Sequence, residues 1–327
     1  MGMLIDGKWS EEDRIWSEGG YKRATSPFQG ANDEPVVDRL RRTPERFLLI
    51  ASDSCPWSHR ARLVLAVKRM DALPVHLAHG ARVEGYALAG GDHWKIPGTE
   101  REIRHLHELY AHGHPRHTGR STVPVLWDVE AGMIVSNESA DILLAFDRAF
   151  GDTTLAPPGL EAAMAETDAH IYDTLNNGVY KAGFARSQAN FDAAAEGVFE
   201  TLLWLERRLA RTRFLHGDLL TLSDLRLFPT LVRFDPVYHF LFGCSRLRVR
   251  DLPHVWGYVR DLISDPGIRS TVDFPRMVEP AYLNDGRSAS PILPSLPEID
   301  WDAPHDRDAY GPARMAARDG GSAVFGS

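Results

Sequence analysis

The stretch Arg46–Met70, RFLLIASDSCPWSHRARLVLAVKRM, places a strand, a cysteine and a helix next to one another. Its first part, Arg46–Ser54, is a short apolar run with the length of a buried strand. From Pro56 the apolar residues recur at helical spacing, and proline suits the first turn of a helix. The apolar stripe is expected to contain Ala61, Leu63, Val64, Ala66 and Val67, with Arg60, Arg62, Lys68 and Arg69 outside it. Cys55 is therefore predicted at, or just before, a helix N-terminus.

The chain after this stretch continues the alternation of strands and helices. Pro74–Gly80 predicts a second strand, and residues 101–113 predict a helix. Val125–Trp127 and Met133–Val135 predict two further strands joined by a tight turn, and another helix begins near Glu138–Ser139. The predicted order is therefore β-α-β, α, β-β-α. This order is typical of a thioredoxin-like α/β domain.

The second half of the chain has helical periodicity only. A Pro- and Gly-rich segment, Phe150–Leu160, predicts a linker, and Thr221–Asp224 has the spacing of a capping box. Helical patterns cover about 161–186, 188–211, 221–242 and 252–264. We therefore predict a polar, irregular N-terminal extension (1–45), a thioredoxin-like domain (46–150), an all-helical domain (160–283) and an irregular tail (284–327). The predicted fold class is α/β followed by all-α.

The composition and charge argue against several classes of protein. The 327 residues are enough for two domains, and 43% hydrophobic with 25% charged residues argue against general disorder. The formal net charge of -8 argues against a nucleic-acid-binding protein, whose surface is usually basic. The sequence has no run of about 18 apolar residues and no basic-then-apolar N-terminus, so we expect neither a membrane span nor a signal peptide. We expect a location in the reducing cytoplasm, where Cys55 is a free thiol.

Cys55 has several possible roles at a helix N-terminus: nucleophile, half of a redox pair, metal ligand or inert packing. The backbone N–H groups and partial positive charge at such a terminus stabilise a thiolate, which favours a reactive cysteine. The C-x-x-C motif of a dithiol site is incomplete, because Ser58 stands where a resolving cysteine would be. A mixed disulfide at Cys55 would therefore need a second thiol from solution.

The other cysteine and the histidines argue against two of these roles. Cys244 lies in the predicted helical domain, where packing is a simpler role than that of a resolving thiol. The fourteen histidines are scattered without the spacing of a metal site. We therefore expect no metal cofactor.

Two further segments of the thioredoxin-like domain suit a short peptide ligand. A cis bond at Val123-Pro124 would leave the Val123 backbone free to pair with a peptide, whereas a trans proline would only start a strand. At Glu138–Ser139, a hydroxyl and helix N-terminal amides suit a carboxylate, and the Glu138 carboxylate suits an ammonium group. Plain helix capping is the alternative there. Together with Cys55, these segments favour an anionic thiol peptide, glutathione.

Several motifs resemble those of one enzyme family, the Xi-class glutathione transferases, which are glutathionyl-hydroquinone reductases. The motifs are CPWSHRA (55–61), TVPVLWD (122–128), IVSNESADI (134–142), NNGVYKAGFA (176–185), RFDPVY (233–238) and DLPHVWGYVRDL (251–262). The resemblance extends over about residues 1–275. It implies a thioredoxin-like domain followed by a helical domain, a homodimer, and reduction of quinone-derived glutathione conjugates with glutathione as co-substrate.

The resemblance also implies which residues act. Cys55 is the nucleophile, and Tyr180 and Tyr282 face the substrate from the helical domain. The residues that hold glutathione are Trp94, Lys95, Val123, Pro124, Glu138 and Ser139. Trp94 and Lys95 belong to a Gly-rich loop, in which His93 replaces the family's usual glycine and Lys95 replaces an arginine.

The sequence departs from the family pattern near both ends. Where the family has a His-Tyr-Tyr segment, Phe274–Asp285 keeps only Tyr282, with Pro280 and Ala281 in the other places. Ser26–Gln29 also differs from the usual Ser-x-Phe-Arg. The side of the site that binds the quinone ring is therefore expected to differ from that of the family, whereas the thiol side is intact.

Two alternative functions stay open on the same fold. A conjugating transferase would hold the glutathione thiolate with a hydroxyl, and Ser54 and Ser58 are close to Cys55 in sequence. A non-catalytic glutathione-binding protein would need none of these groups for chemistry, and the altered segment near Tyr282 favours it.

Overall fold

The computed structural model of the chain describes residues 2–12, 16–17, 20–21, 25–79, 82–90, 93–285, 290, 292–296 and 298–325. Contacts within the chain divide it into two compact units. Unit 1 contains Met1–Trp16 and Arg23–Phe150, and unit 2 contains Ser17–Lys22 and Gly151–Ser327. Among the described residues, no helix has both the length and the apolar character needed to cross a membrane.

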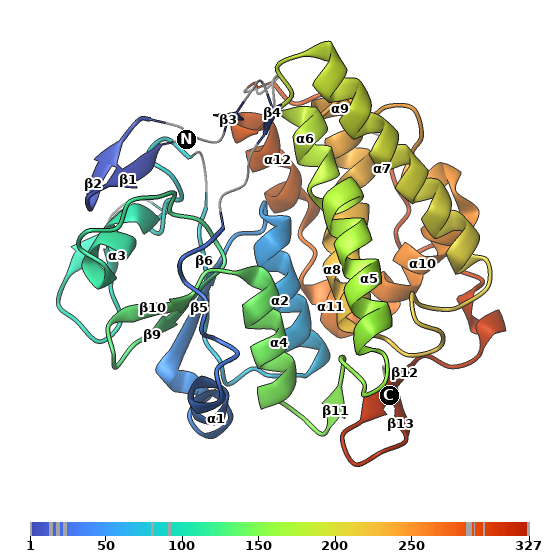
Figure 1. Ribbon diagram of the computed structural model, residues 1–327, viewed down its shortest axis with the longest axis horizontal. Coiled ribbons are helices and arrows are strands. Elements are labelled where there is room, and N and C mark those ends of the chain that lie inside the picture. Colours follow the sequence, from blue (N-terminus) through green and yellow to red (C-terminus); the bar gives the residue numbers. More distant parts are fainter. Residues whose placement is uncertain are drawn as a thin grey trace. The chain divides into compact units, whose positions relative to one another are not determined.

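The core of unit 1 is a four-stranded sheet with the strand order β10-β9-β5-β6 (Figure 1). The strands are β5 (Phe47–Ala51), β6 (Val75–Leu77), β9 (Val125–Asp128) and β10 (Met133–Ser136). β6 runs parallel to β5, whereas β9 runs antiparallel to both β5 and β10. Every residue of β5 is buried, as its apolar sequence predicts for a strand inside a sheet.

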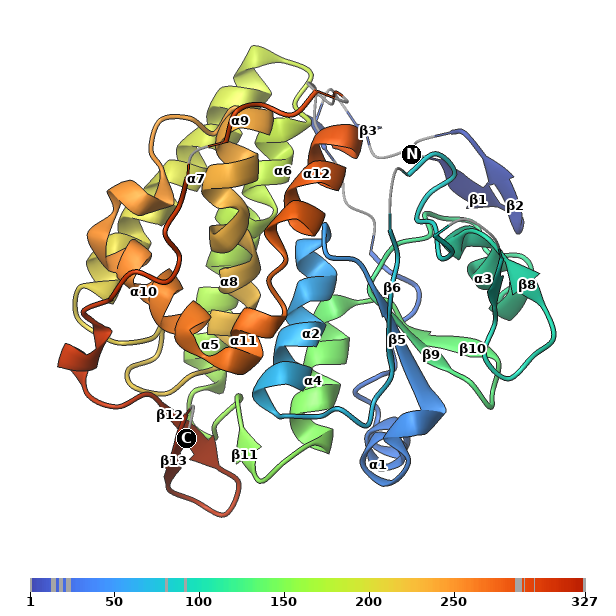
Figure 2. The same ribbon diagram turned by 180° about the vertical axis from the view of Figure 1, so that it is seen from behind.

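Helices cover both faces of this sheet. α2 (Pro56–Val67) and α4 (Ser139–Ala149) lie together on one side, and α3 (Leu106–Gly113) lies on the other side (Figures 1 and 2). α1 (Glu34–Arg42) contacts α4. The order β-α-β, α, β-β-α and the thioredoxin-like fold of this part of the chain are therefore confirmed.

The segments before and between these elements are more regular than the sequence indicates. The short elements of this part are β1 (Met3–Ile5), β2 (Lys8–Ser10), β3 (Trp16–Ser17), β4 (Gly20–Tyr21), η1 (Pro44–Arg46), β7 (Trp94–Lys95) and β8 (Glu102–Ile103). An irregular extension is expected before residue 46, but α1 forms there. Pro35 suits its first turn, and Val36, Val37 and Leu40 are buried on one face.

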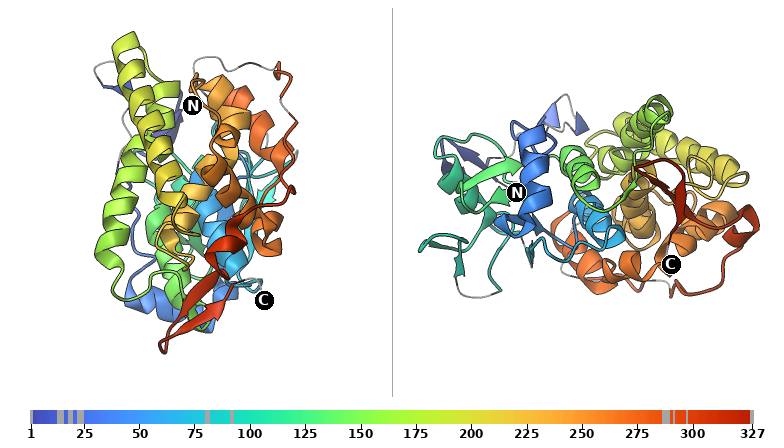
Figure 3. Two further views of the ribbon diagram at one scale, coloured as in Figure 1. Left: turned by 90° about the vertical axis from the view of Figure 1, so that its right-hand side faces the viewer. Right: turned by 90° about the horizontal axis from the view of Figure 1, so that it is seen from below.

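Unit 2 consists mainly of helices. They are α5 (Glu161–Ile171), α6 (Gly178–Gly183), α7 (Gln188–Leu209), α8 (Leu222–Arg233), α9 (His239–Leu241), α10 (Pro253–Ser264), α11 (Pro266–Ser270) and α12 (Phe274–Asn284). Two short π-helical segments, η2 (Tyr172–Asn176) and η3 (Phe234–Tyr238), and one 3₁₀ helix, η4 (Val249–Asp251), lie between them. The left panel of Figure 3 shows the green α5 and α6 beside the long yellow-green α7.

The capping box is confirmed, because the Asp224 carboxylate accepts the Thr221 N–H at 2.9 Å. The all-helical character of this domain is confirmed as well.

The tail is not irregular throughout, contrary to the expectation for 284–327. It contains η5 (Arg307–Tyr310), β12 (Arg314–Ala317) and β13 (Ser322–Val324), and the two strands form a sheet with β11 (Thr153–Thr154). The side chain of Arg307 anchors this part of the tail to the end of α7. This side chain is fully buried, and it donates hydrogen bonds to the Leu209 and Arg213 carbonyls at 2.8 and 2.9 Å. A cation is stabilised beside the exposed carbonyls at a helix C-terminus.

A buried ion pair joins α2 to α4. Lys68 Nζ lies 2.7 Å from Asp147 Oδ1, and both side chains are 1% exposed. Lys68 is the C-cap residue of α2, and Asp147 lies near the end of α4. The Lys68 side chain and the whole of Arg60 are buried, although the sequence places both residues outside the apolar stripe of α2. Helical periodicity predicts which residues share a face, but it does not reveal a buried partner for a charge.

Replacing Lys68 with methionine should lower the free energy of unfolding by about 3–5 kcal/mol, because Asp147 would lose the ammonium group beside its buried carboxylate. Urea denaturation followed by circular dichroism measures the change. The double variant Lys68→Met/Asp147→Leu should recover most of the loss, because neither charge is then left buried. Equal losses in the single and double variants would contradict this role of the pair.

Candidate active site

Cys55 is the N-cap residue of α2. Its side chain is 7% exposed, and its carbonyl accepts the backbone N–H of His59 at 3.1 Å, the first hydrogen bond of the helix. The partial positive charge of the helix N-terminus therefore acts close to the thiol. This is the position that the sequence predicts.

The hydroxyl of Ser58 holds the turn that carries Cys55. Ser58 Oγ accepts the Ser52 N–H at 3.1 Å, and it lies 3.0 Å from the Ser52 carbonyl and 3.1 Å from the Cys55 carbonyl. Ser58 is 0% exposed. The residue in the resolving position therefore lacks a thiol, and its hydroxyl is engaged by the backbone.

The backbone of Val123 lies beside the cysteine sulfur. The Val123-Pro124 bond is cis, and the pairing of β9 with β5 begins only at Val125. The Cys55 thiol donates a weak hydrogen bond to the Val123 carbonyl, with 3.6 Å between sulfur and oxygen. Val123 thus lies outside the β9–β5 ladder, and its predicted pairing with a peptide ligand stays a prediction.

The N-terminus of α4 carries Glu138 and Ser139. Glu138 is the N-cap residue, and its Oε1 accepts the Ala140 N–H at 3.3 Å. Helix capping by Glu138 is therefore real, and it engages one of the two carboxylate oxygens. Ser139 is 1% exposed and begins the helix. Its hydroxyl and the first amides of α4 suit a carboxylate, while Glu138 suits an ammonium group.

Tyr110, on α3, joins the two segments just described. Its hydroxyl donates to the Thr122 carbonyl at 2.8 Å and accepts from the Asn137 side-chain amide at 2.7 Å. Thr122 precedes Val123, and Asn137 precedes Glu138. Burial raises the pKa of Tyr110 to about 12, so the hydroxyl keeps its proton. The sequence does not predict this role, because no local motif links α3 to either segment.

Arg60 brings a positive charge to the N-terminus of α4. The sequence predicts only that it lies outside the apolar stripe of α2, and its burial was not expected. Its guanidinium carbon lies 4.4 Å from the centre of the Trp57 ring, and its Nη1 donates to Ser139 Oγ at 3.5 Å. The residue is 4% exposed. A positive charge in such a poorly hydrated place acts strongly on nearby groups. It adds to the attraction of the α4 N-terminus for an anion.

Trp94 and Lys95 form β7, in the Gly-rich segment after β6. Trp94 is half-buried, and its ring centre lies 4.9 Å from that of His76. Lys95 is exposed, and its ammonium group pairs with the Glu100 carboxylate at 2.7 Å. Within the described residues, neither makes a hydrogen bond, ion pair or ring contact with the cysteine or with the two helix N-termini above. Their predicted role in holding glutathione stays a prediction.

The predicted site residues of unit 2 lie in apolar surroundings. The Tyr180 ring, on α6, packs edge-on against Phe242 and Tyr238, with ring centres 5.3 and 5.9 Å apart. Tyr282, on α12, is 5% exposed and donates its hydroxyl hydrogen to the Pro236 carbonyl at 3.1 Å. Burial raises the pKa of Tyr282 to about 12. The role of Tyr180 and Tyr282 in contacting the substrate stays a prediction.

Cys244, in unit 2, is not part of a disulfide, and it is fully buried. Its backbone N–H donates to the Tyr238 carbonyl at 3.1 Å. A thiol with no exposed surface is poorly placed to exchange with a disulfide on another molecule. Its burial therefore favours packing over the alternative role of resolving thiol.

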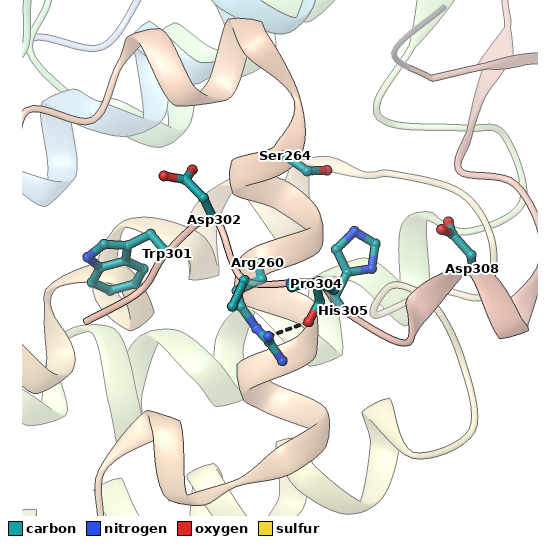
Figure 4. A pocket seen from close by; sticks show the side chains of 8 residues that line it. Arg260, Ser264, Trp301, Asp302, Pro304, His305 and Asp308 are labelled. Atoms are coloured by element: carbon teal, nitrogen blue, oxygen red, sulfur yellow. Dashed lines mark hydrogen bonds between the residues drawn. The ribbon is translucent and has the colours of Figure 1, made fainter. Parts of the chain in front are cut away.

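A pocket of about 320 Å³ lies between α10 and the tail of unit 2 (Figure 4). Its lining residues are Arg260, Ser264, Trp301, Asp302, Ala303, Pro304, His305 and Asp308. The Arg260 guanidinium donates a hydrogen bond to the Pro304 carbonyl, which ties the tail to α10. None of the predicted site residues lines this pocket. It therefore belongs with the anchoring of the tail rather than with the thiol.

Family models match both halves of the chain. The N-terminal domain of glutathione S-transferase matches residues 54–149, and the C-terminal domain of glutathione S-transferase matches residues 188–261. The first range contains Cys55, Val123 and the N-terminus of α4. The arrangement around the thiol therefore lies in a domain of known type.

Relatives cover nearly the whole chain. Glutathionyl-hydroquinone reductase YqjG of Escherichia coli (strain K12) is 38% identical, over 94% of this chain and 99% of the relative. Glutathionyl-hydroquinone reductase PcpF of Sphingobium chlorophenolicum is 35% identical, over 91% of this chain and 96% of the relative.

Solved structures agree with this relationship. The glutathione-bound structure of YqjG has a TM-score of 0.79 and 36% identity, with 94% of this chain and 99% of that chain covered. The Xi-class enzyme from Natrialba magadii has a TM-score of 0.83 and 33% identity, with 94% and 98% covered. The similarity in sequence and in fold extends over both domains, and so the chain belongs to the glutathione S-transferase family, within the Xi class that contains the glutathionyl-hydroquinone reductases.

Proposed function

We propose that this protein is a glutathionyl-hydroquinone reductase, which removes glutathione from its substrate through a disulfide between Cys55 and glutathione. The observation that carries this proposal is the single thiol at the N-terminus of α2, with the engaged hydroxyl of Ser58 in the resolving position. A dithiol enzyme releases its partner internally, whereas this site needs a second thiol from solution. Two relatives that cover almost the whole chain carry the name of this activity.

Glutathione is proposed to lie with its peptide along Val123 and with its γ-glutamyl group at the start of α4. The nearness of the Val123 carbonyl to the cysteine sulfur supports the first contact. The amides of α4 and the Ser139 hydroxyl would hold the carboxylate, and Glu138 would hold the ammonium group. The other residues proposed to hold glutathione are Trp94, Lys95 and Pro124.

In the first step, the Cys55 thiolate attacks the sulfur of the glutathionyl group. A sulfur–sulfur bond forms, the bond from this sulfur to the aromatic carbon breaks, and its electron pair passes into the ring. The ring carbon then takes a proton, and the hydroquinone leaves. Tyr180 is proposed to stabilise charge on a ring oxygen and to supply the proton. Tyr282 is proposed to assist, which requires its hydroxyl to leave the Pro236 carbonyl.

In the second step, the thiolate of a second glutathione attacks the glutathione sulfur of the mixed disulfide. Cys55 leaves as a thiolate, and oxidised glutathione is released. One glutathionyl-hydroquinone and one glutathione thus become one hydroquinone and one oxidised glutathione. The two glutathione sulfurs supply both electrons that reduce the ring carbon.

The environment of the serines argues against a conjugating transferase. Such an enzyme holds the glutathione thiolate with a hydroxyl that donates to it. The Ser58 hydroxyl is buried among backbone groups, and the Ser54 hydroxyl lies 3.1 Å from the Ser52 hydroxyl. Cys55 is therefore the better candidate for direct contact with the glutathione sulfur.

Replacing Cys55 with serine should abolish reduction of glutathionyl-menadiol, because a hydroxyl cannot form the disulfide intermediate. Release of menadiol in the presence of glutathione, followed by chromatography, measures the rate. The matched control is Cys244→Ala, which removes the buried thiol of unit 2 and should keep the wild-type rate. Equal rates for the wild type and Cys55→Ser would refute the mechanism. No turnover by a wild-type protein that still binds glutathione would favour the non-catalytic alternative.

Tyr110→Phe should raise the KM for glutathione about fivefold, because the segments that carry Val123 and Glu138 lose the hydroxyl that joins them. Steady-state kinetics with varied glutathione measures the effect. Tyr310→Phe is the control, because it also removes a hydroxyl-to-carbonyl hydrogen bond, at 3.1 Å to Ala210 in unit 2. The same KM for the wild type and Tyr110→Phe would show that Tyr110 does not position the glutathione site.

The cellular setting follows from the same chemistry. We propose that the protein works in the cytoplasm, where glutathione is abundant and where both of its cysteines stay out of disulfides. The resemblance to the family further suggests a homodimer. Fractionation of cells tests the first proposal, and light scattering of the purified protein tests the second.

A further inference from the structure

Three potential metal ligands meet at the N-terminus of α3 in unit 1. Glu84, in the loop after β6, has a carboxylate oxygen 3.6 Å from His107 Nε2 and 3.9 Å from His105 Nδ1. The ligand atoms of the three residues all lie within 4.8 Å of one another. His105 is the N-cap residue of α3, and His107 lies in its first turn. No other group of this kind occurs in the part of the chain that the structure describes.

The Nε2 atom of His107 gives a second observation that points to a bound cation here. The residue is 8% exposed, and its Nε2 is buried without a hydrogen-bond partner among the described residues. A buried polar nitrogen without a partner is costly, and native structures usually supply one. The 3.6 Å to the Glu84 carboxylate is too long for a hydrogen bond. A cation between the two groups would satisfy both.

Ring contacts hold the two imidazoles in place. The Trp9 ring stacks on the His107 ring, with 4.6 Å between their centres. The rings of His105 and His107 are nearly parallel, with an angle of 9° and 5.5 Å between centres. Ligands that are already ordered lose little conformational entropy on binding. The two histidines are therefore ordered before an ion binds, and their nearly parallel rings would still have to turn toward one ion.

Backbone hydrogen bonds hold the loop of Glu84 against α3. The Leu88 N–H donates to the Arg104 carbonyl at 2.8 Å, and the Leu106 N–H donates to the Tyr86 carbonyl at 2.9 Å. Glu84 precedes this connection, and its side chain is 51% exposed. The exposed carboxylate can therefore move toward a metal ion.

We propose that Glu84, His105 and His107 bind a divalent transition-metal ion, for which Zn²⁺ is the best match. Two imidazoles and one carboxylate form a ligand set that Zn²⁺ accepts, with water in the fourth position. Imidazole ligands disfavour Mg²⁺ and Ca²⁺, which prefer oxygen. In tetrahedral zinc sites the ligand atoms lie roughly 3.3 Å apart, so Glu84 must close the cluster. Scattered histidines predict no metal site from sequence, but the fold brings these two together with Glu84.

A bound ion would join the loop of residues 82–90 to the start of α3. This role is structural, and it does not depend on the function proposed for Cys55. The site is therefore tested by binding and stability, with no need for an assay of activity.

Titration of the untagged full-length protein with Zn²⁺ by calorimetry, without glutathione, measures the proposed binding. We expect one ion per chain. Glu84→Gln removes the carboxylate charge at an exposed position and should weaken binding about tenfold or more, as should His107→Gln. His112→Gln, on the same helix but outside the cluster, should bind like the wild type. At the same Zn²⁺ concentration, the rise in Tm should be larger for the wild type than for Glu84→Gln.

Cys55 is the other zinc-binding group to control for, since a thiolate also binds Zn²⁺. The variant Cys55→Ser should bind Zn²⁺ as the wild type does. Loss of binding in Cys55→Ser, with binding retained in Glu84→Gln, would assign the ion to the thiol and overturn the proposal. Absence of binding by the wild type, or equal affinity in the wild type and Glu84→Gln, would overturn it too. Circular dichroism of His107→Gln confirms that its fold is intact.

Discussion

The hydroxyl of Ser58 joins the end of β5 to the first turn of α2, and the chemistry proposed for Cys55 depends on this turn. Ser58 accepts the Ser52 N–H and lies within hydrogen-bonding distance of the Ser52 and Cys55 carbonyls. A thiol in its place would be a much weaker hydrogen-bonding group. The same residue therefore holds the cysteine at the helix N-terminus and removes the second thiol of a dithiol site. The proposed dependence on external glutathione rests on both effects.

Contacts within unit 1 order the two segments that are proposed to hold glutathione. The Val123 carbonyl lies against the sulfur, and Arg60 reaches from α2 to Ser139 at the start of α4. Tyr110 connects the two ligand-binding segments from α3, on the other face of the sheet. The ion pair of Lys68 with Asp147 fastens the far ends of α2 and α4. Tyr110 and the Lys68–Asp147 pair are thus proposed to order the site without contacting the substrate.

Local sequence patterns predicted the parts of this arrangement that depend on neighbouring residues. Pro56 and the apolar run before Cys55 predicted the strand, the helix and the N-cap position, and the capping box at Thr221 was equally clear. Motifs also indicated the segments of Val123 and Glu138. The resemblance to a family then supplied the substrate class, which no local pattern contains.

The remaining features depend on partners that are distant in the sequence. Trp57 and Ser139 stabilise the buried guanidinium of Arg60. In the tail, Arg307 donates a hydrogen bond to the Leu209 carbonyl at the end of α7 and so anchors this segment. Residues 84, 105 and 107 meet only because the loop after β6 is hydrogen-bonded to α3. Periodicity along the chain contains no information about such contacts. The regular elements were therefore predictable, whereas buried charges and long-range clusters were not.

Cys55 is proposed to form a disulfide with glutathione that glutathione alone resolves. Intact-mass spectrometry of the wild-type protein after incubation with oxidised glutathione tests this most directly, with peptide mapping to locate the adduct. We expect one glutathionyl group on Cys55, which reduced glutathione removes completely. Absence of an adduct, an adduct on Cys244 instead, or an adduct that reduced glutathione does not remove would contradict this proposal.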